Sequence, residues 1–98
     1  MSTVILRLAA AGITLPDPVA PIANYVPFVR TGNLVHISGQ VSLDAAGGIT
    51  GVVGVDLDKA AAVRAARLCG INLLAQMRAA CDGDLDRVTR VVKLGGFV

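Results

Sequence analysis

The stretch DLDKAAAVRAARLCGINLLAQMRAAC, Asp56–Cys81, decides how the rest of the chain is arranged. It contains no proline, and it is dominated by Ala, Leu, Arg, Gln and Met, which are all strong helix formers. Asp56 or Asp58 is placed to cap the first turn, where a carboxylate also suits the positive end of the helix dipole. Gly83 follows the stretch and is free to take the left-handed conformation that ends many helices. The stretch therefore predicts one long helix.

Apolar and charged side chains fall on opposite faces of this helix when successive residues are placed 100° apart. The small and apolar face holds Ala62, Ala65, Ala66, Cys69, Leu73, Met77 and Ala80. Arg64, Arg67 and Arg78 lie on the opposite face, which is most simply solvated, with contact to a neighbouring subunit as the alternative. At 1.5 Å per residue the helix is roughly 37 Å long, so we expect its apolar face to lie along a sheet.

Before the helix, turn residues and prolines divide the chain into short elements. Residues 3–11 predict a short helix, capped by Ser2 or Thr3 and ended by Gly12, and residues 16–21 predict an extended, proline-rich arm. Residues 24–30 and 34–38 predict two strands of a hairpin, joined by the turn at residues 31–33. Pro27 confines the first strand to a sheet edge or a bulge.

Weaker signals flank the long helix on both sides. Residues 44–48 predict a turn, and residues 49–55 predict a weak strand or a loop. After the helix, the β-branched run of residues 88–94 predicts a strand. Together these elements predict a single α+β domain over residues 1–98, in which one long helix packs on a small sheet.

The composition limits the class of protein. The chain is 54% hydrophobic and only 16% charged, which is more apolar surface than a 98-residue monomer can cover, so we expect a homo-oligomer. No apolar run approaches the roughly 18 residues that a membrane span requires. A net charge of +2 without a basic cluster argues against a nucleic-acid partner. The absence of a secretory pattern and the two isolated cysteines favour a cytoplasmic location.

No cluster of residues indicates catalysis or metal binding. Cys69 and Cys81 are roughly 18 Å apart along the helix, which is too far for a disulfide. His36 has no partner at metal-ligand spacing, so we expect a structural role for it and no metal or cofactor. Ser38 has no evident partner base and is better interpreted as a hydroxyl donor beside the flexible Gly39. The glycines at positions 47–54 match no phosphate-binding motif.

Six segments nevertheless follow a shared pattern in order and spacing over essentially the whole chain. They are GITLP (12–16), NY (24–25), GNLVHISGQ (32–40), NLLA (72–75), LDRV (85–88) and VVKLGGFV (91–98). In these segments the chain resembles the RidA/YjgF family, also called the endoribonuclease L-PSP family. It is most similar to the branch whose members begin with a short extra helix and the ITLP segment.

This resemblance implies a chorismate-mutase-like α+β fold, assembled as a homotrimer with ligand clefts between subunits. Well-described members hydrolyse reactive enamines and imines to 2-keto acids and ammonia, without a metal or cofactor. Tyr25 matches the family's pocket tyrosine, and Ser38 and Gly39 match the loop that lines the cleft. The Arg that grips the substrate carboxylate, and its acidic partner, belong to family segments beyond Val98. We therefore expect this chain to be the N-terminal portion of the usual domain.

The leading functional hypothesis is an enamine/imine deaminase-type protein whose ligand is a small carboxylate or imine. Because the carboxylate-gripping Arg is not among the 98 residues, we expect weak or no turnover by them alone, and the catalytic residues stay unassigned. One alternative is a non-catalytic trimer that binds a small carboxylate for regulation. Another is the RNA-cleaving or translation-inhibiting activity of the older family label, and a half-domain without its own function is a third.

Overall fold

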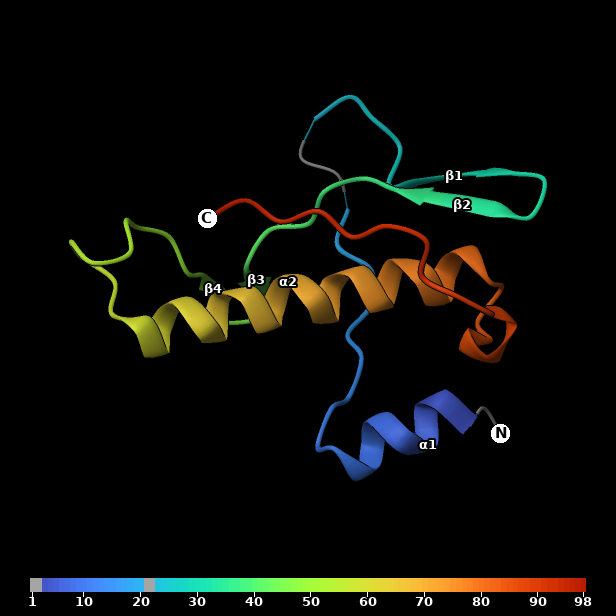
Figure 1. The fold of residues 1–98 in the computed structure, drawn as a ribbon, viewed down its shortest axis with the longest axis horizontal. Coiled ribbons are helices and arrows are strands. Elements are labelled where there is room, and N and C mark those ends of the chain that lie inside the picture. Colours follow the sequence, from blue (N-terminus) through green and yellow to red (C-terminus); the bar gives the residue numbers. More distant parts are fainter. Residues whose placement is uncertain (1–2, 21–22) are drawn as a thin grey trace.

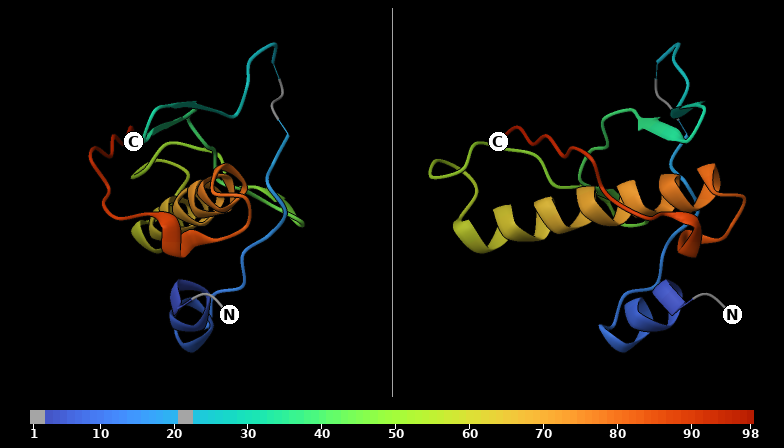
Figure 2. Two further views of the ribbon diagram at one scale, coloured as in Figure 1. Left: turned by 90° about the vertical axis from the view of Figure 1, so that its right-hand side faces the viewer. Right: turned by 45° about the vertical axis from the view of Figure 1, so that its right-hand side comes forward.

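The long helix organises the fold, as Figure 1 shows for the computed structural model of the chain, which describes residues 3–20 and 23–98. The elements are α1 (Thr3–Ala10), β1 (Phe28–Thr31), β2 (Leu34–Ile37), β3 (Leu43–Asp44), β4 (Gly47–Gly48), α2 (Lys59–Ala80) and the 3₁₀ turn η1 (Leu85–Arg87). The β1–β2 hairpin lies on one side of α2 and α1 lies on the other, and both turned views in Figure 2 agree. The predicted α+β architecture with one long helix is confirmed.

Helix α2 begins at Lys59, three residues later than the predicted start at Asp56. The carboxylate of Asp58 accepts a hydrogen bond of 2.7 Å from the backbone N–H of Ala61, which makes Asp58 the cap. Asp56 is used elsewhere, because its carboxylate accepts the backbone N–H of Val52 and closes the loop that precedes the helix. The sequence left Asp56 and Asp58 as candidate caps. The structure assigns this role to Asp58, because Asp56 is bonded within the preceding loop.

Helix α2 ends where the sequence predicted, just before Gly83. Cys81 is the C-cap, and Asp82 and Gly83 both have positive φ, at 55° and 90°. The backbone N–H of Gly83 returns to the Arg78 carbonyl at 2.8 Å, which satisfies one of the carbonyls left open at a helix end. Arg87 forms an ion pair of 3.0 Å with Asp82, across the turn that leads into η1.

Strands β1 and β2 form an antiparallel hairpin in which Phe28 pairs with Ile37 and Thr31 pairs with Leu34. Gly32 turns the chain with a φ of 57°, as expected for the first central residue of a two-residue loop. The first strand is shorter than the predicted 24–30, since Pro27 has no N–H to donate. The Pro27 carbonyl still accepts the Ser38 N–H at 2.9 Å, so pairing continues just past the strand ends.

The predicted turn at residues 44–48 is the tip of a second, minimal hairpin. Strands β3 and β4 pair through Leu43 with Gly48, and the Asp44 carboxylate accepts the Ala46 N–H at 2.9 Å within the turn. Residues 49–55 form a loop with one isolated bridge, between Val53 and Leu57. Within residues 3–20 and 23–98 the strands therefore form two small two-stranded sheets rather than one continuous sheet.

The buried side of α2 differs from the predicted apolar face. Its most buried residues are Asn72, Ala75, Gln76 and Ala80, and only Ala80 belongs to the predicted set. Most of the other predicted residues are half-buried, and Ala66 is exposed. The prediction was wrong because two amide side chains hydrogen-bond to neighbouring segments and therefore turn their side of the helix inward. Arg64, Arg67 and Arg78 are exposed, as predicted.

Helix α1 is confirmed at Thr3–Ala10, with Gly12 at a φ of 77° just after it, and Thr3 is its first described helical residue. Ser2 lies outside the described residues. The backbone N–H groups of Thr3 and Val4 donate to the carboxylate of Asp86 in η1. Of the predicted arm, residues 16–20 are described and have no regular structure, as expected.

The predicted strand at residues 88–94 is absent from the described chain. Residues 88–98 run as an extended segment back along α2 in Figures 1 and 2. A β-branched sequence becomes a strand only when a neighbouring edge accepts its hydrogen bonds, and none of the described strands pairs with it. Its apolar side chains are therefore exposed, with Val92 at 68% and Leu94 at 76%.

Two further sequence predictions concern the cysteines and the absence of a membrane span. Cys69 and Cys81 are both free thiols, in agreement with their predicted separation along the helix. Among the residues that the structure describes, no helix is both long enough and apolar enough to cross a membrane.

Candidate functional site

A cavity of about 230 Å³ lies where the N-terminal arm, the open end of the β1–β2 hairpin and α2 meet. Nine residues from these elements line it: Val19, Ala20, Tyr25, Pro27, Gly39, Gln40, Val41, Leu43 and Asn72. Most of this lining is apolar, which is typical of small-molecule sites, where a few polar groups fix the orientation of a ligand. The phenol of Tyr25 and the amides of Gln40 and Asn72 are the polar side chains among these residues.

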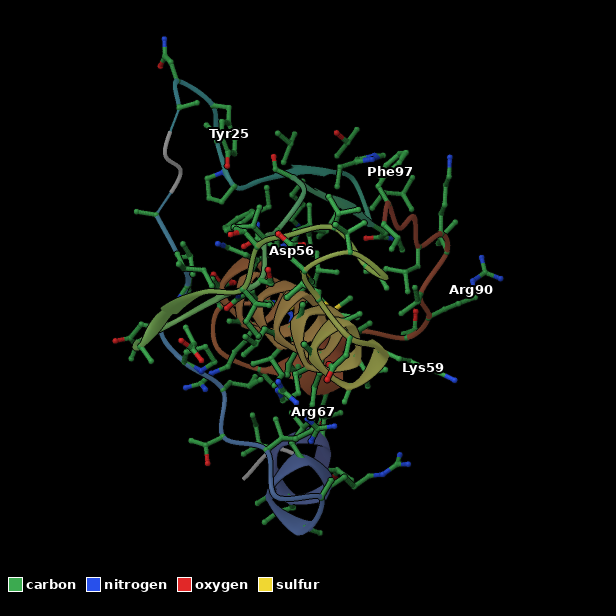
Figure 3. All side chains as sticks on the ribbon, turned by 90° about the vertical axis from the view of Figure 1, so that its left-hand side faces the viewer. Tyr25, Asp56, Lys59, Arg67, Arg90 and Phe97 are labelled. Atoms are coloured by element: carbon green, nitrogen blue, oxygen red, sulfur yellow. The ribbon has the colours of Figure 1, made fainter. Side chains whose placement is uncertain are left out.

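The structure brings two of the three sequence-predicted site residues to this cavity. Tyr25 and Gly39 both line it, one from the segment before β1 and the other from the segment after β2. Tyr25 is 45% exposed, so its ring is accessible to a ligand. Figure 3 shows Tyr25 on the segment that leads to the hairpin. Their role in ligand binding stays a prediction.

Ser38 has a different position from the one its motif suggested. It is not among the lining residues, and its hydroxyl donates a hydrogen bond of 2.8 Å to the Val26 carbonyl. Its backbone N–H donates to Pro27. Ser38 therefore holds the segment that carries Tyr25 against the end of β2, which supports the cavity wall rather than lining it.

Asn72 forms the wall of the cavity on the α2 side and was not predicted as a site residue. It is only 3% exposed, and its Nδ2 donates to the carbonyls of Val41, at 3.0 Å, and Leu43, at 2.9 Å. These two bonds attach α2 to the segment that enters β3. A polar residue between Ile71 and Leu73, at the border of an apolar helix face, was the sequence signal that could have identified it.

Gln40 repeats this arrangement on the hairpin side of the cavity. Its Nε2 donates to the carbonyl of Ser38 at 3.1 Å and to that of Gly39 at 3.3 Å. The side chain is thus folded back onto its own segment, and its conformation is restricted. The sequence motif included Gln40 but gave no reason to place it at the site.

Gln76, one turn after Asn72, fastens the arm to α2. It is 1% exposed, and its Nε2 donates a bond of 2.9 Å to the Val19 carbonyl. Its Oε1 is buried without a hydrogen-bond partner among the described residues. A buried acceptor without a hydrogen-bond partner costs free energy. Gln76 therefore positions Val19 at the cavity, but the unpaired Oε1 offsets part of the stabilisation from its hydrogen bond.

No charged side chain is among the nine lining residues. In Figure 3, Lys59 and Arg90 extend outward on the side of the molecule away from Tyr25. His36, the one histidine of the chain, is exposed on β2 opposite Val29 and is not among the lining residues. The cavity therefore offers shape, an apolar surface and neutral hydrogen-bonding groups, but no group that could grip a carboxylate through charge.

A second hollow of about 180 Å³ lies near the end of α2, away from these residues. Asp17 and Arg78 line it together with prolines of the arm and small residues of the helix. Both charged side chains are exposed to solvent, where charges are well screened. We regard the neutral cavity as the better candidate site.

Comparison with known proteins identifies a family and relatives that are similar in sequence. Residues 5–98 match the family described as "YjgF/chorismate_mutase-like, putative endoribonuclease". Protein TCP17 of Trypanosoma cruzi is 46% identical over 93 residues, which cover 94% of this chain and 58% of that protein.

Two solved structures have a similar fold. The protein Atu1372 of unknown function from Agrobacterium tumefaciens is 48% identical with a TM-score of 0.75, over 88% of this chain and 52% of that one. A "putative endoribonuclease" from Shewanella oneidensis MR-1 is 33% identical with a TM-score of 0.81, over 88% of this chain and 57% of that one. The chain thus spans a little more than half the length of these relatives.

Proposed function

Because this chain belongs to the YjgF/chorismate mutase-like family, we propose that its Tyr25 cavity is part of an enamine/imine deaminase-type site. The substrates would be small, reactive 2-imino or 2-enamino acids, which water converts to a 2-keto acid and ammonia. The observation that carries this proposal is the meeting of Tyr25 and Gly39 at one small, largely apolar cavity. These are two of the residues at which the sequence resembles the family's pocket.

The proposed chemistry needs a group that the cavity wall does not supply. A planar carboxylate is best held by a bidentate guanidinium, and none of the lining residues is charged. The family resemblance assigns this Arg to a segment beyond Val98. We therefore expect the 98 residues to bind the reacting end of the ligand but to catalyse its hydrolysis weakly or not at all.

The exposed apolar surface supports a homotrimeric assembly as part of the proposal. Large apolar side chains are exposed on the hairpin and on the segment after η1, including Val29, Leu34, Val92 and Phe97. Exposed apolar residues in such numbers are unusual for a monomer and are common at subunit contacts. The two free thiols support placing the protein in a reducing compartment, the cytoplasm.

A coupled assay tests the deaminase proposal. An enzyme that generates 2-aminoacrylate is mixed with the chain, and pyruvate release is compared with the spontaneous rate. Binding of 2-aminobutyrate, a stable analogue that carries an amine as well as a carboxylate, is titrated in parallel. We expect weak acceleration or none, and saturable binding that Tyr25→Ala weakens about tenfold, as loss of a buried aromatic contact would. His36→Ala, at an exposed residue outside the cavity, is the matched control. Binding that Tyr25→Ala leaves unchanged would reject this site.

A second candidate function is non-catalytic binding of a small molecule. The neutral cavity wall favours it, because no lining residue other than Tyr25 can transfer a proton. Saturable binding without any acceleration, also in assemblies containing the rest of the family domain, would select this alternative over the deaminase.

A third candidate is RNA cleavage, the activity after which the Shewanella oneidensis relative is named. Ribonuclease activity usually requires general acid–base groups, and the one histidine of this chain lies outside the cavity. Cleavage of a labelled RNA by freshly purified protein, abolished by a substitution at the cavity, would favour this candidate instead.

A further inference from the structure

We propose that the Tyr25 cavity receives the N–H-bearing end of its ligand, an amine, ammonium or iminium group, and disfavours a carboxylate. This inference rests on the proposed function for the place of the site and narrows the chemistry that the site accepts. It follows from the orientation of two amide side chains, Asn72 and Gln40.

The amide of Asn72 has a fixed orientation. Its nitrogen faces the carbonyls of Val41 and Leu43, and two carbonyl oxygens can be satisfied only by the NH₂ side of the amide. Turning the amide over would place its own oxygen against these two carbonyl oxygens. Asn72 is only 3% exposed, so water could not relieve that contact. The donors of Asn72 are therefore used, and its Oδ1 is the polar atom that a ligand can address.

Gln40, on the segment after β2, is oriented by the same rule. Its Nε2 faces the carbonyls of Ser38 and Gly39, so its two protons are also directed at the backbone. The remaining polar atom of this side chain is Oε1, another acceptor. Two residues that line one cavity thus both have their amide nitrogens bonded to the backbone, and we infer that their oxygens are left for the ligand.

This arrangement discriminates between ligand groups. An N–H donor would satisfy Asn72 Oδ1 or Gln40 Oε1 and, if charged, would be stabilised by their dipoles. A carboxylate would lose its hydration and face two acceptor oxygens, and the one donor that the lining side chains could still offer is the Tyr25 hydroxyl. We therefore expect the carboxylate of a complete substrate to point out of this cavity, toward a cation supplied from elsewhere.

Two probes with one carbon skeleton test the inference. Isobutylammonium and isovalerate share an isobutyl group and carry opposite head groups, and each is titrated into the 98-residue chain at neutral pH while nuclear magnetic resonance follows the amide signals. We expect isobutylammonium to bind at least about tenfold more tightly. We also expect it to shift the side-chain amide signals of Asn72 and Gln40. Equal or tighter binding of isovalerate, or no binding of either probe, would overturn the inference.

Variants show whether Gln40 and Asn72 contact the ligand or only support the structure. The quantity compared is the ratio of the affinities for isobutylammonium and isovalerate. Gln40→Lys replaces an acceptor with a cation and should reverse the preference, whereas Gln40→Glu should strengthen it. Asn72→Leu should reduce the ratio toward one. His36→Ala, at an exposed residue of β2 that does not line the cavity, is the control and should keep the wild-type ratio. A ratio that Gln40→Lys and Asn72→Leu leave at the wild-type value would also overturn the inference.

The probes and the deaminase assay fail independently of each other. Ammonium selectivity without any pyruvate release, also in assemblies that contain the rest of the family domain, would leave the inference intact and reject the proposed deaminase function. Pyruvate release with a preference for isovalerate would support the deaminase and reject the inference. If Asn72→Leu does not fold, the Gln40 pair alone decides, since Gln40 is only half-buried and bonds to its own segment.

Discussion

The carboxylate of Asp86 accepts a hydrogen bond of 2.7 Å from the backbone N–H of Thr3, 83 positions earlier in the chain. A second bond, of 2.9 Å, comes from the N–H of Val4. Two of the N–H groups that every helix leaves open at its start are thus satisfied by a residue of η1. Asp86 is itself fixed, because its backbone N–H donates to the Asp84 carboxylate at 3.0 Å. The position of α1 therefore depends on the order of the turn after α2.

Substituting Asp86 with Ala should loosen α1 specifically. Loss of a helix cap costs about 1 kcal/mol, so we expect faster hydrogen exchange of the α1 amides and little change in α2. Hydrogen–deuterium exchange measures this, and Asp17→Ala, at an exposed arm residue, serves as the control. Unchanged protection of α1 in Asp86→Ala would show that other contacts hold the helix in place.

Asn72 and Gln76 should differ in their contributions to stability. Asn72→Leu leaves the carbonyls of Val41 and Leu43 without their donor, and we expect a loss of about 2 kcal/mol or more in the free energy of unfolding. Gln76→Leu loses one bond but also removes the unpaired buried Oε1, so we expect a loss of about 1 kcal/mol or less. Urea denaturation compares them, and a larger loss for Gln76→Leu would contradict the assignment of the amide roles.

The two aspartates before α2 should have separable effects. Asp58→Ala removes the helix cap and should lower stability by about 1 kcal/mol, with reduced protection in the first turn of α2. Asp56→Ala should instead loosen residues 52–57, because its carboxylate accepts the Val52 N–H. Residue-resolved hydrogen exchange distinguishes the two patterns. Equal effects of both substitutions on the first turn of α2 would argue against a single cap.

Gly51 should tolerate substitution less well than Gly54. Both have positive φ, at 148° and 87°, so an alanine is strained at either position, by about 1 kcal/mol. A Cβ at Gly51 would also lie 2.7 Å from Asp56 Oδ1 and 2.8 Å from Leu57 Cγ, whereas nothing lies within 4 Å at Gly54. We expect Gly51→Ala to lower the thermal midpoint further than Gly54→Ala. The reverse order would show that the loop rearranges freely.

The sequence predicted best those features that depend on a few neighbouring residues. The left-handed turn at Gly83, the hairpin turn at Gly32 and the choice of Asp56 or Asp58 as a cap each follow from local backbone chemistry. The family resemblance and the α+β architecture were predicted from the order of such segments, and both are confirmed. Tyr25 and Gly39 were placed at one site by resemblance, and the structure brings them to one cavity.

Features that depend on distant partners were missed. Periodicity assigned the buried face of α2 by hydrophobicity alone, and it could not show that Asn72 and Gln76 would find backbone carbonyls in other segments. Asp86 accepts the N–H groups of Thr3 and Val4, and no local pattern connects Asp86 to the start of α1. The strand expected at residues 88–94 needs a neighbouring edge, and the described strands do not supply one.

The most direct test of the neutral, acceptor-lined cavity is a crystal structure of the chain grown with isobutylammonium. We expect the ligand nitrogen within about 3 Å of Asn72 Oδ1 or Gln40 Oε1, with the isobutyl group against the apolar lining beside Tyr25. The amide nitrogens should keep their bonds to the backbone. Isobutylammonium bound only elsewhere, or amides turned over so that their NH₂ groups face the cavity, would contradict this account of the site.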